Sequence, residues 1–137
     1  MSSLNKGKYE AFFIDIDYFC ARPTIESCSR KEPNGTVVFL GFDYGAEVYR
    51  LGKAFDESDL SRRDFLSKMK EYKEKYGDVF YRDRLAYIPD ADLEMLSVLL
   101  TTIMRSERFG DGCIAEAVSD GSIAAILLRL RELTKVG

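Results

Sequence analysis

Two aspartates near the N-terminus are the residues whose type and spacing come closest to catalytic chemistry. Asp15 and Asp17 alternate with apolar residues in the segment Phe12-Phe-Ile-Asp-Ile-Asp-Tyr-Phe19. On a β-strand, side chains two residues apart share a face, and two carboxylates placed so can hold one divalent metal ion. On a helix the same side chains lie about 200° apart. The two aspartates would then simply belong to the solvent-exposed part of an amphipathic helix.

The metal hypothesis needs further residues. The segment resembles the first metal motif of translesion DNA polymerases and, more faintly, that of haloacid-dehalogenase-type phosphatases. The polymerases need a far longer chain than 137 residues and a second acidic cluster, and the phosphatases need lysine and acidic motifs on later strands. Neither set is found in this sequence. A metal-dependent hydrolase or phosphotransferase that uses Asp15, Asp17 and a third carboxylate such as Asp43 therefore stays an alternative hypothesis.

A second group of candidate residues lies at a predicted junction between two helices. Arg105, Glu107, Arg108 and Asp111 are close together in the sequence. As a binding site for an anion or a partner, the arginines would lie beside the free backbone N–H groups of the next helix. As a structural feature, an arginine would bind unpaired carbonyls of one helix end and the aspartate would cap the next helix. We favour the structural interpretation, because the Asp-Gly pairs in this region have the composition of turns.

Other catalytic and ligand-binding motifs are missing from the sequence. The chain has no histidine, which removes Ser-His-Asp and Cys-His catalysis. Cys20, Cys28 and Cys113 form no Cys-x-x-Cys pair, so we expect free thiols and no zinc site. No glycine-rich phosphate loop is present. We therefore expect no cofactor and lean against an enzyme.

The charge balance and hydropathy limit the classes of partner. The chain has 20 basic and 23 acidic residues and a net charge of −3, which argues against a dedicated nucleic-acid binder. No apolar segment approaches the roughly 20 residues of a membrane helix. The first residues lack the apolar core of a signal peptide, so we expect a cytoplasmic protein without membrane contact. A nucleic-acid-associated protein remains a further alternative, through Arg105, Arg108, Arg129 and Arg131.

Hydrophobic periodicity predicts a mainly α fold. The first predicted helix, residues 7–20, is ambiguous, because its pattern also fits a strand; we favour helix. Ser61-Arg-Arg-Asp64 has the spacing of a capping box, and Gly77 is placed as a C-terminal cap. The other helices are expected at Tyr44–Phe55, from Ser61 to Gly77, from Asp90 to Phe109, from Asp111 to Ser119, and from Ile123 to Leu133.

The remaining segments predict little β structure. Residues 21–35 are expected to form a loop with a turn at Pro33-Asn34-Gly35. Thr36 to Phe42 is β-branched and aromatic and fits one extended segment, for which Val79-Phe80-Tyr81 is a speculative partner. The length indicates one domain. We expect a mainly α single domain over residues 1–137, of about five or six helices with at most a minor β element, and flexible ends at 1–6 and 135–137.

The C-terminal part of the chain resembles an uncharacterised prokaryotic family known only as a domain of unknown function. The resemblance rests on Arg105-Ser-Glu-Arg-Phe-Gly-Asp-Gly112, on the turn Ser119-Asp-Gly-Ser-Ile123, and on the Leu/Arg-rich last helix. It covers residues 80–134 well and extends more loosely to 42–49 and 16–19. Relatives often have cysteine at the position of Gly110. The resemblance implies an α-rich domain and favours helix around Asp15, but it implies no activity.

These observations favour a small intracellular interaction or regulatory module without catalysis. Its partner would be another protein or a second copy of the chain, because neither nucleic acid nor a membrane fits the composition.

Overall fold

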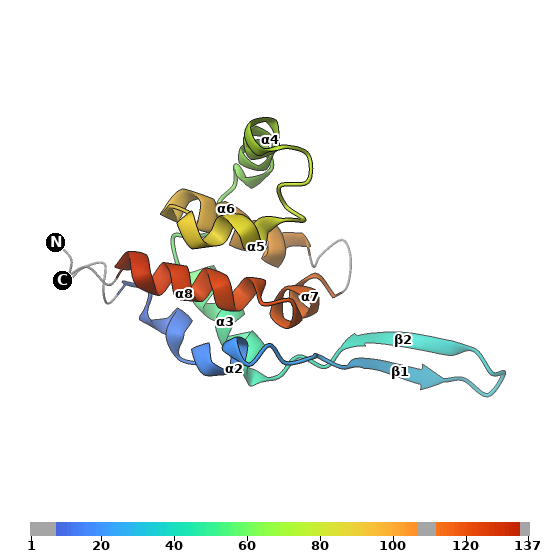
Figure 1. The fold of residues 1–137 in the computed structure, drawn as a ribbon. Helices are drawn as coiled ribbons and strands as arrows, with labels where there is room; N and C mark the ends of the chain where they lie inside the picture. Colours follow the sequence, from blue (N-terminus) through green and yellow to red (C-terminus); the bar gives the residue numbers. More distant parts are fainter. Residues whose placement is uncertain (1–7, 107–111, 135–137) are drawn as a thin grey trace.

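The chain folds into a body of helices with one β-hairpin (Figure 1). The computed structural model describes residues 8–106 and 112–134, with the side chain of position 40 left aside. The described elements follow the order η1, α2, β1, β2, α3, α4, α5, η2, α6, α7 and α8. The mainly α fold predicted from the sequence is confirmed, and the hairpin is its minor β element. The expected flexible ends fall outside the described residues.

The N-terminal segment is helical, in two short pieces. The 3-10 helix η1 spans Glu10–Phe13 and the α-helix α2 spans Ile16–Cys20. Asp15 lies between them with non-helical backbone angles, φ −110° and ψ 27°, which prevents one continuous helix. Phe12 and Phe19 are buried and attach both pieces to the core. The preference for helix over strand in residues 7–20 is therefore correct, but not as one continuous amphipathic helix.

The β structure is a single antiparallel hairpin. Strand β1, Ser27–Lys31, pairs with β2, Val37–Phe42, in a two-stranded sheet. The turn between them is closed by a backbone hydrogen bond of 2.7 Å from the Glu32 N–H to the Thr36 carbonyl, and Gly35 takes a φ of +89° there. The predicted turn at Pro33-Asn34-Gly35 is confirmed. Placing all of residues 21–35 in a loop is wrong, because β1 lies within them.

The predicted partner of the extended segment is also wrong. Residues 79–81 lie in a turn, and Phe80 is fully buried. Its ring stacks on those of Tyr72 and Tyr76, with centroids 5.3 and 5.5 Å away. The apolar, aromatic composition that suggested a strand is thus explained by packing of an aromatic cluster.

Four helical elements follow the hairpin. Helix α3 spans Ala46–Glu57, α4 spans Phe65–Tyr76, α5 spans Arg84–Tyr87, and the 3-10 helix η2 spans Ile88–Asp90. Gly77 ends α4 with a φ of +112°, as predicted. The predicted capping box is wrong: α4 begins after Asp64, whose side chain caps no backbone N–H and instead binds Arg62 at 2.8 Å.

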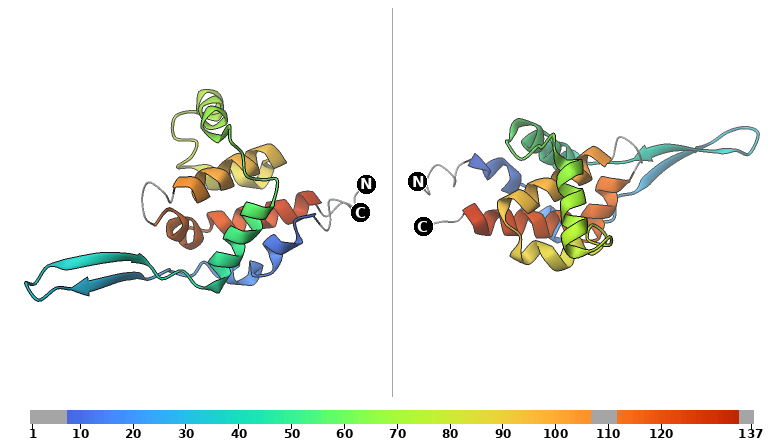
Figure 2. Two further views of the ribbon diagram at one scale, coloured as in Figure 1. Left: turned by 180° about the vertical axis from the view of Figure 1, so that it is seen from behind. Right: turned by 90° about the horizontal axis from the view of Figure 1, so that it is seen from above.

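Helices α6 and α8 form the centre of the body. Helix α6, Leu93–Ser106, begins after Asp92, whose carboxylate accepts a hydrogen bond of 2.8 Å from the Met95 N–H. Helix α8, Ser122–Thr134, packs against α6 and also against α2, α5, α7 (Cys113–Ser119) and η2. Figure 2 shows α8 running through the body with the other helices around it, while α4 lies at the outside. The largest fully buried side chains of the two central helices are Leu96, Leu99, Leu100, Ile103, Ile123, Ile126, Leu127 and Leu130.

A buried arginine fixes the turn between α7 and α8. Arg84 is 5 % exposed. It donates hydrogen bonds of 2.9 Å to Ser122 Oγ, 3.0 Å to the Tyr81 carbonyl and 3.0 Å to Asp120 Oδ2. The other Asp120 oxygen accepts the Ser122 N–H at 2.7 Å and so caps α8. The second Asp-Gly pair of the sequence is therefore a helix cap held by an arginine.

The same turn is covered on its outer side by Arg22. Gly121 takes a φ of +90°, and a Cβ at this position would lie 2.6 Å from Arg22 Nε. Arg22 has a φ of +52°, which is unusual for a residue other than glycine. Two arginines, Arg22 and Arg84, therefore lie against this turn.

We expect the substitution Arg84→Met to destabilise the protein by about 2 to 3 kcal/mol, because it leaves a partly buried Asp120 carboxylate and the Ser122 hydroxyl without their partner. Arg82→Met is the matched control: Arg82 pairs with Asp83 at the surface, where its side chain is 75 % exposed. Its cost should stay below about 0.5 kcal/mol. Chemical denaturation measures both; equal costs would contradict the role assigned to Arg84.

The helices of the described residues include none with the length and apolar character needed to cross a membrane.

Candidate interaction surface

Only one residue of the predicted charged cluster is described by the structure. Arg105 lies in the last turn of α6, half-buried, and its Nη2 donates a hydrogen bond of 2.9 Å to Ser61 Oγ. This contact ties the end of α6 to the segment between α3 and α4, and it differs from the binding of helix-end carbonyls that the structural interpretation expected. Glu107, Arg108 and Asp111 lie outside the described residues, so the proposed anion or partner site stays a prediction.

The two N-terminal aspartates have separate surroundings. Asp15 binds Arg50 of α3 through both oxygens, at 2.6 and 2.8 Å. Arg50 holds the pKa of the Asp15 carboxyl below its ordinary value through these hydrogen bonds. Asp17 and Asp43 are exposed. Among residues 8–106 and 112–134, no group of three or more His, Cys, Asp or Glu side chains is placed to hold a metal ion.

The Asp15–Arg50 pair predicts a pH-dependent contribution to stability. Because the folded-state pKa of Asp15 is lowered, the contribution is present above the unfolded-state value of about 3.9 and is lost as the pH falls through the folded-state pKa. We expect Asp15→Asn to lower the melting temperature at pH 7 and to have little effect near pH 2. The neighbouring exposed Asp17→Asn is the control. Thermal unfolding followed across this pH range measures the difference; a gap between wild type and Asp15→Asn that persists in acid would refute the assignment.

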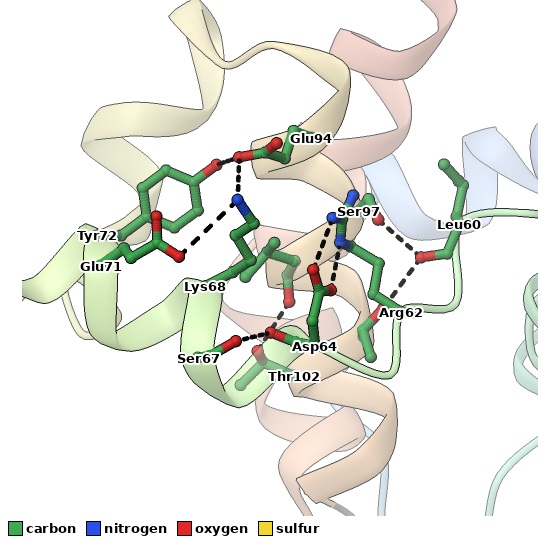
Figure 3. Close-up of polar contacts among 12 residues, drawn as sticks. Leu60, Arg62, Asp64, Ser67, Lys68, Glu71, Tyr72, Glu94, Ser97 and Thr102 are labelled. Carbon is green, nitrogen blue, oxygen red and sulfur yellow. Dashed lines mark hydrogen bonds and ion pairs between the residues drawn. The ribbon is translucent and has the colours of Figure 1, made fainter.

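A polar cluster joins α4 to α6 (Figure 3). The Leu60 carbonyl accepts hydrogen bonds from two buried hydroxyls of α6, Ser97 at 2.8 Å and Thr101 at 3.0 Å. Farther along, the Tyr72 hydroxyl donates to Glu94 Oε1 at 2.9 Å, and burial together with this bond raises the pKa of Tyr72. The cluster positions α4 against α6. Each of these groups has a structural partner.

The buried polar side chains of the described part are all paired within the protein. Within that part, every buried side-chain nitrogen or oxygen has a hydrogen-bond partner. Two open hollows of about 460 and 610 Å³ lie beside Phe42 and beside Tyr49. The charged residues lining them are Glu116 in the first and Lys53, Asp56 and Glu57 in the second. The described charged lining is thus acidic in the first hollow and mixed in sign in the second.

The hairpin is the most prominent surface feature of the molecule. We call residues 27–42 the arm. Figures 1 and 2 show it projecting from the helical body, with no helix lying over it. All five residues of β1 are exposed. On β2, Val37 is 64 % exposed and Phe39 is 46 % exposed, which is unusual for large apolar side chains on a strand.

A β-bulge determines which side chains of the arm share a face. Ser29 pairs with Phe39 and Cys28 pairs with Gly41, so β2 has one extra residue between these positions. The extra residue returns Phe42 to the face that carries Val37 and Phe39. The rings of Phe39 and Phe42 consequently meet edge to face, with centroids 5.5 Å apart. One face of β2 is therefore a continuous apolar row from the body toward the turn.

The base of the arm is anchored on α7. The Phe42 ring stacks on Tyr44 with a centroid distance of 6.2 Å, and the Tyr44 hydroxyl accepts a hydrogen bond of 3.3 Å from the Ala115 N–H. Gly112 precedes α7 with a φ of +96°, and a Cβ there would lie 2.7 Å from the Phe42 ring. The arm is thus held at its base and uncovered beyond it.

We expect Gly112→Ala to be more destabilising than Gly35→Ala. Both residues have a positive φ, near +90°, so each substitution costs about 1 to 2 kcal/mol of backbone strain. Only at Gly112 must an aromatic ring also move, because the space around Gly35 is open. Chemical denaturation of the two variants measures the difference, and equal costs would argue against the Phe42 anchor.

The sequence contains one indicator of the arm that does not depend on hydrophobic periodicity. Asn34-Gly35 between two segments of strand length is a strong hairpin indicator. This dipeptide alone does not predict strand β1, because β1 has the sequence Ser-Cys-Ser-Arg-Lys and no apolar alternation. A strand with no buried face has no hydrophobic pattern to detect.

Comparison with known proteins places this chain in a family. Residues 10–136 match the group described as "Family of unknown function (DUF6508)", and the chain therefore belongs to it. The resemblance to a domain of unknown function is thereby confirmed, and the family carries no assigned activity. Neither the curated proteins nor the solved structures gave a match.

Proposed function

We propose that this chain is a non-catalytic interaction module whose arm is the contact element. The observation that carries the proposal is the exposure of Val37 and Phe39 on a strand that projects from the body. Exposed apolar rows that continue along an edge strand are avoided in proteins that do not use them, because they promote association.

The rest of the described surface supports this choice. Ile14, Tyr49 and Leu66 are also strongly exposed, but they lie in the turn before α2, on α3 and on α4, respectively. Scattered apolar residues of this kind are normal on protein surfaces. The arm instead places two such residues side by side next to Phe42. We extend the proposal to a single-domain intracellular protein that acts by binding and not by chemistry.

We expect Phe39→Ser to remove binding without unfolding the body, because Phe39 lies outside the buried core and contacts Phe42 within the arm. Leu66→Ser is the matched control, since Leu66 is 72 % exposed on α4, away from the arm. The tagged wild type and both variants are used to capture proteins from the native host, a second untagged copy of the chain included. A specific ligand should be retained by wild type and Leu66→Ser and reduced about tenfold or more by Phe39→Ser.

Circular dichroism and thermal melting establish that both variants are folded. Identical capture by all three proteins would contradict the proposal that the arm is the contact element.

A further inference from the structure

We infer that the arm binds the arm of a second copy of this chain, through antiparallel pairing of the two β2 strands. The product is a four-stranded sheet in the order β1-β2-β2-β1 across a twofold axis. The inference rests on the proposed function, in which the arm is the contact element, and adds the identity of the partner. It is carried by the two edges of the hairpin, which differ in composition.

Only one edge of the arm is suited to pairing. Each outer edge of a two-stranded sheet presents unpaired backbone N–H and C=O groups. On β1 that edge carries Arg30 and Lys31, and charged residues of this kind discourage the addition of a strand. Strand β2, with the sequence Val-Val-Phe-Leu-Gly-Phe, has no charge. The edge without protection is therefore that of β2.

The β2 edge is complementary to itself. The bulge beyond Phe39 interrupts the straight part of the strand, which leaves Val37–Phe39 as its regular segment. In antiparallel pairing centred on Val38, Val37 lies opposite Phe39 of the second copy, and Phe39 lies opposite its Val37. A twofold interface requires this reciprocity. Both pairs join an aromatic to a β-branched side chain, a combination that stabilises sheets, and no like charges face each other.

Pairing with a second copy removes two unfavourable features, the low stability of a lone hairpin and the exposure of Val37 and Phe39. A lone two-stranded hairpin is only marginally stable, whereas three or more strands with an apolar face are stable. The four-stranded product brings Val37 and Phe39 of both copies together on one face, where each covers the other. Because the arm projects from the body, antiparallel arms place the two bodies at opposite ends of the sheet (Figure 1). The contact is small, so we expect a reversible, concentration-dependent dimer.

Sedimentation equilibrium of the full chain, up to several hundred micromolar, tests the inference. We expect a reversible monomer–dimer equilibrium for wild type. Val37→Lys should raise the dimer dissociation constant about tenfold or more, because it places a charge on the unprotected edge. The new lysine faces Lys31 within the arm, but Val37 is 64 % exposed and outside the buried core, so the helical body should keep the wild-type melting temperature. Leu66→Lys adds the same charge at a residue that is 72 % exposed and should dimerise like wild type.

A disulfide experiment tests the register. With Cys20 and Cys28 replaced by serine, Val38→Cys places a thiol directly opposite its symmetry mate, with Cα atoms about 5 Å apart, within reach of a disulfide. Mild oxidation should give a covalent dimer. Leu66→Cys in the same background should stay monomeric, which also controls for Cys113.

Three results would overturn the inference: a wild-type monomer at every concentration, a dimer that Val37→Lys does not weaken, or crosslinking that is no better at position 38 than at 66. If the chain is monomeric but captures other proteins in a Phe39-dependent way, the partner is not a second copy and the proposed function still holds. If neither occurs, both fail.

Discussion

The buried guanidinium of Arg84 is the interaction on which the arrangement of the C-terminal half depends. It joins α5 to the turn before α8 by binding Asp120 and Ser122. That turn fixes where α8 starts, and α8 packs against α2, α5, α6, α7, η1 and η2. It equally fixes the end of α7, whose first turn supports Phe42 and Tyr44 at the base of the arm. A buried arginine is costly unless all its partners are present. Here the cost is offset by three hydrogen bonds and by the Tyr81 ring 4.4 Å below the guanidinium.

Charged residues elsewhere in the molecule also serve as connections between elements that are distant in the sequence. Asp15 and Arg50 join α2 to α3, and Arg105 joins the end of α6 to Ser61. The Tyr72–Glu94 bond joins α4 to α6. Residue types that suggest chemistry when read along the chain are thus used for tertiary structure. Asp15 illustrates this most clearly, because the arginine that occupies both its oxygens is 35 positions away and no local pattern could have indicated it.

How well the sequence predicted the fold depended on how local the determining contacts were. Helices α3, α6 and α8 were predicted because each buries a continuous apolar face, and Gly77 and the turn at Asn34-Gly35 were predicted because backbone geometry alone selects those residues. The start of α4 was missed, because Arg62 binds Asp64 and removes the expected cap. Strand β1 was missed, because its five residues are exposed and lack alternation. Of the candidate site residues, Asp15 pairs with Arg50 and Arg105 with Ser61, and neither partner was predicted, because both follow from the tertiary fold alone.

The arm differs from the rest of the described chain in that two large apolar side chains on one face of a strand are left exposed together. Phe42 is explained by Tyr44 and Gly112, and the buried hydroxyls of α6 are explained by the Leu60 carbonyl. Among the described residues, Val37 and Phe39 have no comparable explanation: they are exposed, and serine or threonine would form the same strand at lower risk of aggregation. Natural sequences depart from the rules of folding mainly where function requires it. The uncharged apolar edge of β2 beside the charged edge of β1 is a departure of this kind. Pairing of the β2 edges of two copies gives both strands a physical reason for their composition: β2 is apolar because it pairs, and β1 is charged because it does not.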